Sequence, residues 1–171
     1  MKIKGKKISG PNKEIIPIPR GDGNDIIFIA EAVLDQSHFD KLCPVPKPAT
    51  KKIDGVDIPD LDDKNYLKNL NTWGEKKTAW MVLKALEATP DLEWEMVNMN
   101  DPSTWLLFRT EFRDAGLNDH EINRVINGAL TAQGLNEQKV EEARDRFLRS
   151  EQARQEVLLS LKGEQLSMQS G

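Results

Sequence analysis

The side chains that most often perform catalysis or bind metals are few in this sequence, and they stand apart from one another. The two histidines, His38 and His120, have no partner at metal-ligand spacing, apart from the weak pair that His38 makes with Cys43 five residues later. Cys43 precedes a proline and has no base beside it, so it does not resemble a cysteine nucleophile. We expect both histidines at the surface or at helix starts, Cys43 as a small packed apolar residue, and no catalytic, metal or cofactor site.

Acidic residues are grouped in two places, and neither group has the spacing of a known site. The run ATKKIDGVDIPDLDD, residues 49–63, lacks the alternating acids and the final glutamate of a calcium-binding EF-hand loop. We expect it to form a solvated loop that leads into a helix, whose N-terminus favours acids. Glu93 and Glu95 would share one face of a strand, and nothing else marks them as catalytic. We therefore expect a protein that is not an enzyme.

Composition favours a cytoplasmic protein. Hydrophobic residues make up 38% and charged residues 30%, and a single cysteine allows no intramolecular disulfide, which fits a reducing compartment. No run approaches the roughly 18 apolar residues of a membrane span, and no apolar run follows the N-terminal lysines as in a signal peptide. The net charge is −4, with basic residues concentrated toward the N-terminus. We therefore expect no membrane and no specific nucleic-acid partner.

Two apolar runs near the N-terminus predict a β-hairpin. They cover Glu14–Ile18 and Asp25–Leu34 and flank the sequence PRGDGN, whose RGD triplet we interpret as turn chemistry. Pro17 lacks a backbone N–H, so the first strand should lie at a sheet edge. A short helix, capped by Asp35 or Ser37, should follow and end at CPVPKP, where three prolines favour an extended path.

Helical periodicity dominates the rest of the chain. A long helix is predicted from about residue 62 to residue 88, with Gly74 weakening its middle by about 1 kcal/mol relative to alanine. The run LEWEMVNM alternates apolar and acidic residues, which indicates a short strand or an extended segment that packs on helices. A second helix should begin at DPSTW, with Asp101 as its N-cap and Pro102 in its first position, and should end at Gly116.

A short pattern of glycine, leucine, asparagine and an acid occurs twice, at residues 116–119 and 134–137. Each glycine suits the left-handed residue just past a helix end, each asparagine suits the next helix cap, and Glu121 can complete a capping box. We interpret both as corners between helices rather than as a functional repeat. The alternative is a helix-turn-helix of residues 118–132 and 136–148, but the four acids on its recognition helix would repel DNA phosphates.

Apolar surfaces are the candidate sites for a protein partner. The second strand of the hairpin contains the run IIFIA, which is apolar enough to need cover on both faces. Trp73 and Trp80, seven residues apart on the long helix, either anchor the core or belong to a partner-binding groove or oligomer seam. The last helix carries a narrow apolar stripe among charges of both signs. The partner-binding hypothesis therefore comprises Ile26, Ile27, Phe28, Ile29, Trp73, Trp80, Phe147 and Leu158.

These elements predict an α+β protein in which an N-terminal β-hairpin arm precedes a mostly α-helical bundle of about four helices. The expected divisions are residues 1–42 for the arm and short helix, 43–63 for a Pro/Asp-rich linker, 64–161 for a helical domain and 162–171 for a flexible tail. A lone hairpin is marginal in water. We expect it to pair with a second copy of the chain or with a partner's strand, while the helical part folds without it.

Three stretches resemble small proteins encoded by tailed bacteriophages: FDKLCPVPKPA, WMVLKALEATPDLEWEMVNMNDPSTW and AGLNDHEINRVINGALTAQGLNEQKVEEARDRFL. The likeness spans roughly residues 25–150, and the layout of a short β arm followed by helices is similar to that of phage tail assembly chaperones. The resemblance implies a protein of the host cytoplasm that keeps the long tape-measure protein soluble while tail-tube subunits assemble around it. Expected partners are therefore a tape-measure or tail-tube protein, or another copy of the chain. The alternatives are a DNA-binding regulator and a structural component of the virion.

Overall fold

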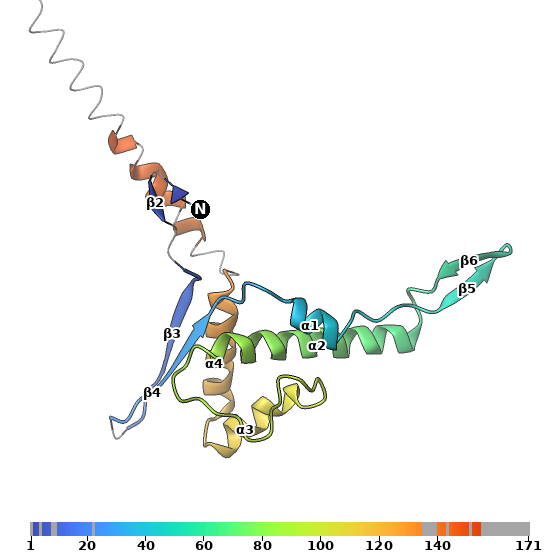
Figure 1. Ribbon diagram of the computed structural model, residues 1–171, viewed down its shortest axis with the longest axis horizontal. Coiled ribbons are helices and arrows are strands. Elements are labelled where there is room, and N and C mark those ends of the chain that lie inside the picture. The colour runs from blue at the N-terminus through green and yellow to red at the C-terminus, as the bar shows by residue number, and fades with distance from the viewer. Residues whose placement is uncertain are drawn as a thin grey trace, which may run out of the picture. The chain divides into compact units, whose positions relative to one another are not determined.

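The computed structural model describes residues 2–3, 5–7, 10–21, 23–134, 140–142, 144–150 and 152–154 of the 171-residue chain. The chain divides into two units, residues 1–133 and residues 134–171. In the first unit, strands and helices contribute to one hydrophobic core (Figure 1). The predicted α+β class is therefore confirmed.

The hairpin that the sequence predicts consists of β3, Lys13–Ile18, and β4, Ile26–Glu31. The two strands pair antiparallel along their whole length and form a two-stranded sheet, so each has one outer edge, as expected for the first strand. Side chains alternate between the two faces of a strand. One face of the hairpin is therefore buried, and it comprises Ile16, Ile18, Phe28 and Ala30.

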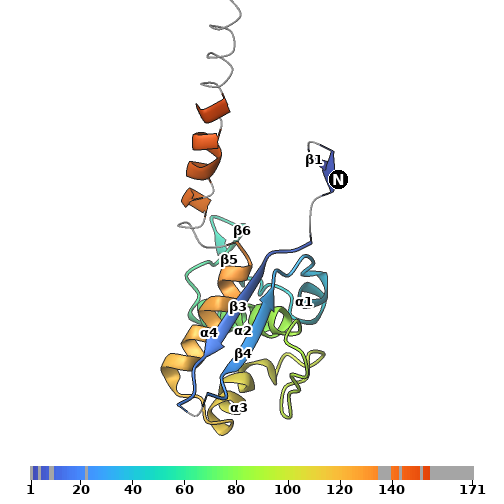
Figure 2. The same cartoon turned by 90° about the vertical axis from the view of Figure 1, so that its left-hand side faces the viewer.

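The buried face of the hairpin packs on two helices, α2 (Lys64–Leu86) and α4 (Asp119–Ala132) (Figure 2). Gly128 permits a close approach of α4, because a Cβ atom added there would lie 2.4 Å from the Cγ1 atom of Ile16. The hairpin thus belongs to the main core. This packing contradicts the expectation that the helical part folds without the hairpin, since removing the strands would expose the apolar faces of both helices.

Helix α2 begins and ends within two residues of its predicted limits. Asp63 caps it, because its carboxylate accepts a hydrogen bond from the N–H of Tyr66 at 2.7 Å. The C-terminal part of the helix carries its buried side chains, Ala79, Trp80, Val82, Leu83, Ala85 and Leu86. These residues form the centre of the core.

Helix α1, Ser37–Leu42, supplies one ring to an aromatic cluster in the core. Phe39 is fully buried, and its ring centroid lies 5.8 Å from that of Trp73, 5.6 Å from that of Trp80 and 5.6 Å from that of Trp105. Rings at these separations interact favourably beyond the area they bury. The packing of the Phe39 ring therefore holds this six-residue helix against the core.

The segment LEWEMVNM does not form a strand, and the alternative prediction of a segment packed on helices is confirmed. Leu92, Trp94 and Val97 are partly buried against the core, while the acids between them are exposed. The backbone is irregular here because no neighbouring strand lies beside it to complete a ladder in the described residues. The alternation of apolar and acidic residues therefore reflects the burial of one side of a single irregular segment.

The second helix starts later than predicted. A 3-10 turn, η1 at Trp105–Leu107, leads into α3 at Phe108–Asp114. Asp101 begins a turn instead, because its carboxylate accepts hydrogen bonds from the N–H of Ser103 at 2.9 Å and from the hydroxyl of Ser103 at 2.7 Å. These bonds lower the pKa of Asp101. The backbone N–H of Thr104 then bonds back to Asp101 at 3.0 Å, which is a turn rather than an α-helical start.

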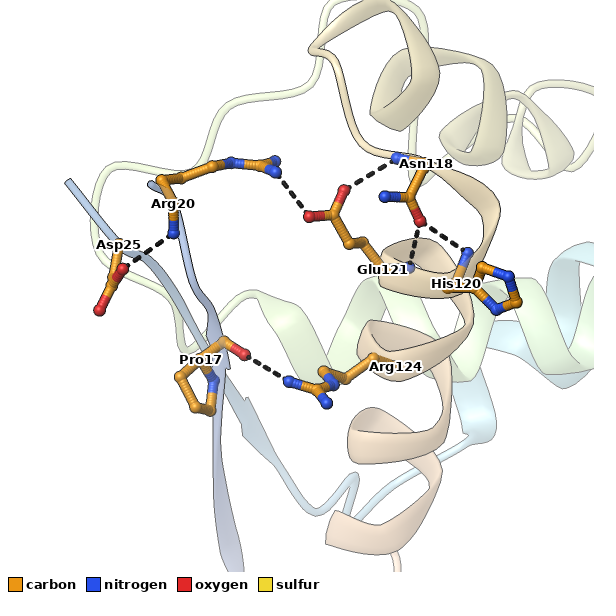
Figure 3. A network of polar contacts seen from close by, with 7 residues as sticks. All are labelled: Pro17, Arg20, Asp25, Asn118, His120, Glu121 and Arg124. Carbon is orange, nitrogen blue, oxygen red and sulfur yellow. Dashed lines mark hydrogen bonds and ion pairs between the residues drawn. The ribbon is translucent and has the colours of Figure 1, made fainter. Parts of the chain in front are cut away.

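The corner between α3 and α4 has the predicted form. Gly116 lies just past α3 with a φ angle of +86°. Asn118 is the N-cap of α4: its side chain accepts hydrogen bonds from the N–H groups of His120 and Glu121 (Figure 3). The Glu121 carboxylate in turn accepts the N–H of Asn118 at 2.9 Å, which completes the capping box.

Glu121 also ties this corner to the turn of the hairpin. The guanidinium of Arg20 donates to its other carboxylate oxygen at 2.5 Å, and the backbone N–H of Arg20 donates to the Asp25 carboxylate at 2.9 Å (Figure 3). A longer contact of 3.5 Å joins Arg124 of α4 to the carbonyl of Pro17. The arginine of the RGD triplet therefore stabilises the hairpin turn, as the sequence predicts.

We expect replacement of Gly116 or Gly134 by valine to lower the free energy of unfolding by more than about 1 kcal/mol each. The φ angles are +86° and +77°, a region that β-branched residues rarely adopt. No atom lies within 4 Å of a Cβ added at either glycine, so backbone strain alone is tested. Urea denaturation measures the change, with Gly10→Val as the control, since that Cβ would also meet open space and its φ is not positive. Unchanged midpoints would contradict the left-handed assignment.

The predicted loop at residues 49–63 is wrong in part, because it contains a second hairpin. Strands β5, Thr50–Ile53, and β6, Val56–Pro59, pair antiparallel. Asp54 and Gly55 join them with φ angles of 52° and 81°. Two residues with positive φ are typical of the tight turn that matches strand twist, and Asp-Gly is its preferred sequence. The many acids in this run concealed that signal.

Two short elements complete the described structure. Strands β1, Lys2–Ile3, and β2, Lys6–Lys7, form a hairpin at the N-terminus. In the second unit, residues 140–142, 144–150 and 152–154 are helical, as predicted for the last helix. Its predicted start at Asn136 lies outside the described residues.

Candidate protein-binding groove

The outer face of the β3–β4 hairpin is apolar and exposed. Ile15 is 67% exposed and Ile27 is 46% exposed, and their cross-strand neighbours are Ile29 and Pro17 respectively. Within this chain only one face of the second strand is covered, so cover of the other face by a second copy or a partner stays a prediction. Exposed apolar residues on one sheet face are a common feature of protein-binding surfaces.

The outer edge of β4 is closed at one residue and open at another. The hydroxyl of Thr89 accepts the N–H of Ile29 at 2.8 Å and donates to the carbonyl of Ile29 at 2.9 Å. The polar groups of Ile29 thus point away from β3. Because this direction alternates along a strand, the N–H and the carbonyl of Ile27 lie on the same outer edge, where they can pair with an added strand.

A groove lies beside this open part of the edge. It encloses about 590 Å³ between the start of β4, the segment after α2, and the end of α3. It is lined by Ile26, Ile27, Phe28, Thr89, Pro90, Asp91, Leu92, Glu93, Trp94, Glu95, Met96, Glu111, Phe112, Asp114, Ala115 and Leu117. A volume of this size is in the range of protein clefts that receive ligands.

The floor of the groove is aromatic. The ring of Phe112 meets the ring of Phe28 edge-on, with centroids 5.5 Å apart, and meets the ring of Trp94 at 5.3 Å. Phe28 and Phe112 are buried, whereas Trp94 is half-buried. Edge-on contacts on both sides fix the orientation of Phe112. The floor is therefore preformed.

One carboxylate holds the wall of the groove in place. Glu111 accepts hydrogen bonds from three successive backbone N–H groups, those of Glu95 at 2.8 Å, Met96 at 2.7 Å and Val97 at 2.9 Å. Hydrogen bonds to an ionised acceptor are stronger than neutral ones. This contact joins the irregular segment to α3 and explains how a loop without a ladder keeps its position.

The groove is strongly acidic. Five of its lining residues are carboxylates, and lysine and arginine are missing from the lining. Asp91, Glu93, Glu95 and Asp114 are exposed. An apolar floor with a rim of one charge favours a partner that carries apolar side chains and positive charge.

The structure places the residues of the partner-binding hypothesis in different environments. Ile26 and Ile27 line the groove, and Ile29 lies on the outer face of the hairpin. Phe147 is 59% exposed in the second unit. Leu158 lies outside the described residues.

Three aromatic members of the hypothesis lie in the core or pack against it. Trp80 is 1% exposed and lies within the aromatic core, so it anchors the fold and does not face a partner. Phe28 is 6% exposed and contributes only the floor beneath the groove. Trp73 is half-buried, and its indole N–H donates to the carbonyl of Cys43 at 2.9 Å, which indicates a structural role. Phe39 of α1 lies against the rings of Trp73 and Trp80, and Phe112 of α3 lies against the ring of Phe28.

The two histidines and the cysteine lie in the environments that the sequence predicts. His38 and His120 are exposed near the starts of their helices, and Cys43 is a free cysteine packed against the core. Within the described part of the chain, no three His, Cys, Asp or Glu side chains are placed to hold a metal ion. The turn of the alternative helix-turn-helix includes residues 135–139, which lie outside the described residues.

Sequence reasoning did not find most of the groove. Trp94, Phe112 and Glu111 come from segments that have no strand or repeat pattern in common with β4. The one available signal was the alternation of Leu92, Trp94 and Met96 with acids, which marks a segment with an apolar side and an acidic side. That alternation does not predict which helix or strand the apolar side of the segment packs against.

Comparisons with family models, with curated proteins and with solved structures found no match for this chain. Among the described residues, no helix is long and apolar enough to cross a membrane. The geometry of the groove is therefore the main basis for a functional proposal.

Proposed function

We propose that this protein is a non-enzymatic assembly protein of a tailed phage, similar to a tail assembly chaperone, and that it binds an extended apolar segment of a partner protein. The observation that carries the proposal is the open edge of β4 at Ile27 beside an apolar, acid-rimmed groove. An extended segment can pair its backbone with that edge and place alternate side chains in the groove. The partner would be a tape-measure or tail-tube protein in the host cytoplasm.

The groove suits transient binding of a chain that is not yet assembled. Its floor is aromatic and preformed, so an apolar segment binds there without the cost of ordering the floor. Backbone pairing at a strand edge does not depend on side-chain identity. Both features fit a chaperone that holds a long partner along its length.

Co-expression tests the proposal. We expect the tape-measure protein of the encoding phage to be soluble with this chain and insoluble with the Ile27→Asp variant, because a charge would enter the apolar edge. Val56→Asp is the matched control, since Val56 is 62% exposed and lies on β6, away from the groove. The fraction of tape-measure protein in the supernatant is measured.

Equal solubility with Ile27→Asp and with the parent chain would refute the groove as the binding site. Mass spectrometry of purified phage particles separates the proposal from its rival. A chaperone should leave the assembled tail, whereas a structural component of the virion should remain in stoichiometric amount.

A further inference from the structure

We infer that the groove also receives the lysine-rich N-terminal segment, residues 2–7, of a second copy of this chain. The inference rests on the proposed role of the groove as a protein-binding site and names a specific occupant for it. That occupant would cover the apolar edge until a partner displaces it.

Charge complementarity supports this occupant. The first seven residues contain four lysines, and no acid occurs before Glu14. The groove presents five carboxylates and no lysine or arginine among its lining residues. Ile3, between Lys2 and Lys4, gives the segment an apolar residue with basic neighbours. This composition mirrors the apolar floor and the acidic rim.

The N-terminal hairpin is too small to be stable by itself. Each of its strands has two residues, and an isolated two-stranded hairpin is marginal in water even at ordinary strand length. An acidic surface would supply the counter-charges that residues 1–13 lack. Docking would therefore stabilise both the segment and the open edge.

The length of the tether favours a second copy over the same chain. Asn12 is fixed at the far end of the hairpin, because its carbonyl accepts the N–H of Ala32 at 2.9 Å and its side chain donates to the carbonyl of Ala132 at 3.0 Å. From Asn12 to the level of Ile18, beside Ile26, the strand spans about 20 Å. The five steps from Asn12 back to Lys7 reach at most about 17 Å when fully extended. While β1 and β2 stay paired, Lys7 and its partner Lys2 therefore fall short of the end of the groove at Ile26. The chain's own Lys2 and Ile3 would extend that far only after the two strands separate, whereas a second copy needs no such separation.

Light scattering coupled to size exclusion tests the inference on the full chain. We expect self-association at low salt that weakens at high salt, because exposed charge pairs are screened. Two variants should each weaken it by at least about tenfold. The first variant reverses the charge of four lysines in the N-terminal segment (Lys2→Glu, Lys4→Glu, Lys6→Glu and Lys7→Glu). The second variant reverses the charge of three acids on the rim of the groove (Glu93→Lys, Glu95→Lys and Asp114→Lys). Mixing the two variants should restore association, since each supplies the complement that the other lacks.

A matched variant controls for net charge. It carries Asp40→Lys, Asp57→Lys and Glu75→Lys, which are exposed acids outside the groove. It should associate like the parent chain, and circular dichroism should show that all variants keep their helices. Loss of association in this control equal to that in the rim variant would overturn the inference, as would a parent chain that stays monomeric at low salt.

A labelled peptide of residues 1–9 distinguishes this inference from the proposed function. Salt-dependent binding to the parent chain, lost in the rim variant, supports the inference. If the peptide does not bind but the tape-measure protein is still kept soluble through Ile27, the inference fails and the proposed function stands. If the peptide binds and the tape-measure protein is unaffected by Ile27→Asp, the groove is a self-association site and the proposed function fails.

Discussion

Removing residues 1–34 is expected to abolish cooperative folding of the helical part of the first unit. The hairpin contributes Ile16, Ile18 and Phe28 to the core, and each is 6% exposed or less. Burial of one such side chain stabilises a fold by about 1.5–3 kcal/mol. The three together approach the lower end of the 5–15 kcal/mol that is typical of a whole domain.

The hairpin also satisfies polar groups on the helical side. The side chain of Gln133, after α4, accepts the N–H of Val33 at 2.8 Å, and Arg20 pairs with Glu121. Truncation at residue 34 removes all of these partners at once. Thermal melting followed by circular dichroism should therefore lose its sigmoidal transition.

Truncation of residues 1–9 is the control. It removes β1 and β2 but leaves Asn12 and the whole of β3, so the melting temperature should stay within a few degrees of the parent's, corresponding to less than about 1 kcal/mol. A 35–171 fragment that melts cooperatively at the parent's temperature would show that the hairpin is dispensable and would reinstate it as a separate arm.

Replacing the two helical glycines by alanine is expected to change stability in opposite directions. Gly74→Ala, in α2, should raise the free energy of unfolding by about 0.5–1 kcal/mol, because alanine favours helix and no atom lies within 4 Å of the new Cβ. Gly128→Ala, in α4, should lower it by about 1–3 kcal/mol, because the new Cβ would lie 2.4 Å from Ile16 Cγ1 and 2.5 Å from Ile16 Cδ1. Ile16 is 3% exposed, so a rotation away from the new Cβ would push its side chain into the packed core.

A double mutant identifies the clash as the cause. In the Ile16→Ala background the space beside Gly128 is free, so Gly128→Ala should then be neutral or stabilising. The coupling energy from urea denaturation of the four proteins should be about 1–3 kcal/mol, as for residues in contact. Additive effects would show that α4 and β3 do not approach this closely.

Local structure could be predicted from the sequence because its signals act over a few residues. The capping box of Asn118 and Glu121, the left-handed Gly116 and the extent of α2 each depend on hydrogen bonds or periodicity within one or two helical turns. The alternation along β3 and β4 also predicted a hairpin. Where two local signals competed, as in the acid-rich run around Asp54 and Gly55, the composition concealed the turn.

Only the tertiary structure decided which of these elements pack against one another. The apolar face of the β3–β4 hairpin packs closely on α4 because Gly128 has no side chain. Gly128 is distant in sequence from Ile16, the residue that it contacts. The groove depended on bringing Ile27, Trp94 and Phe112 together, and on Glu111 binding three N–H groups of another segment. Such contacts form because packing the largest rings into one core leaves few arrangements of the chain. The sequence by itself therefore determined the extent of α2, the corner at Gly116 and Asn118 and the β3–β4 hairpin, while long-range packing determined which apolar residues became core and which remained exposed beside an acidic rim.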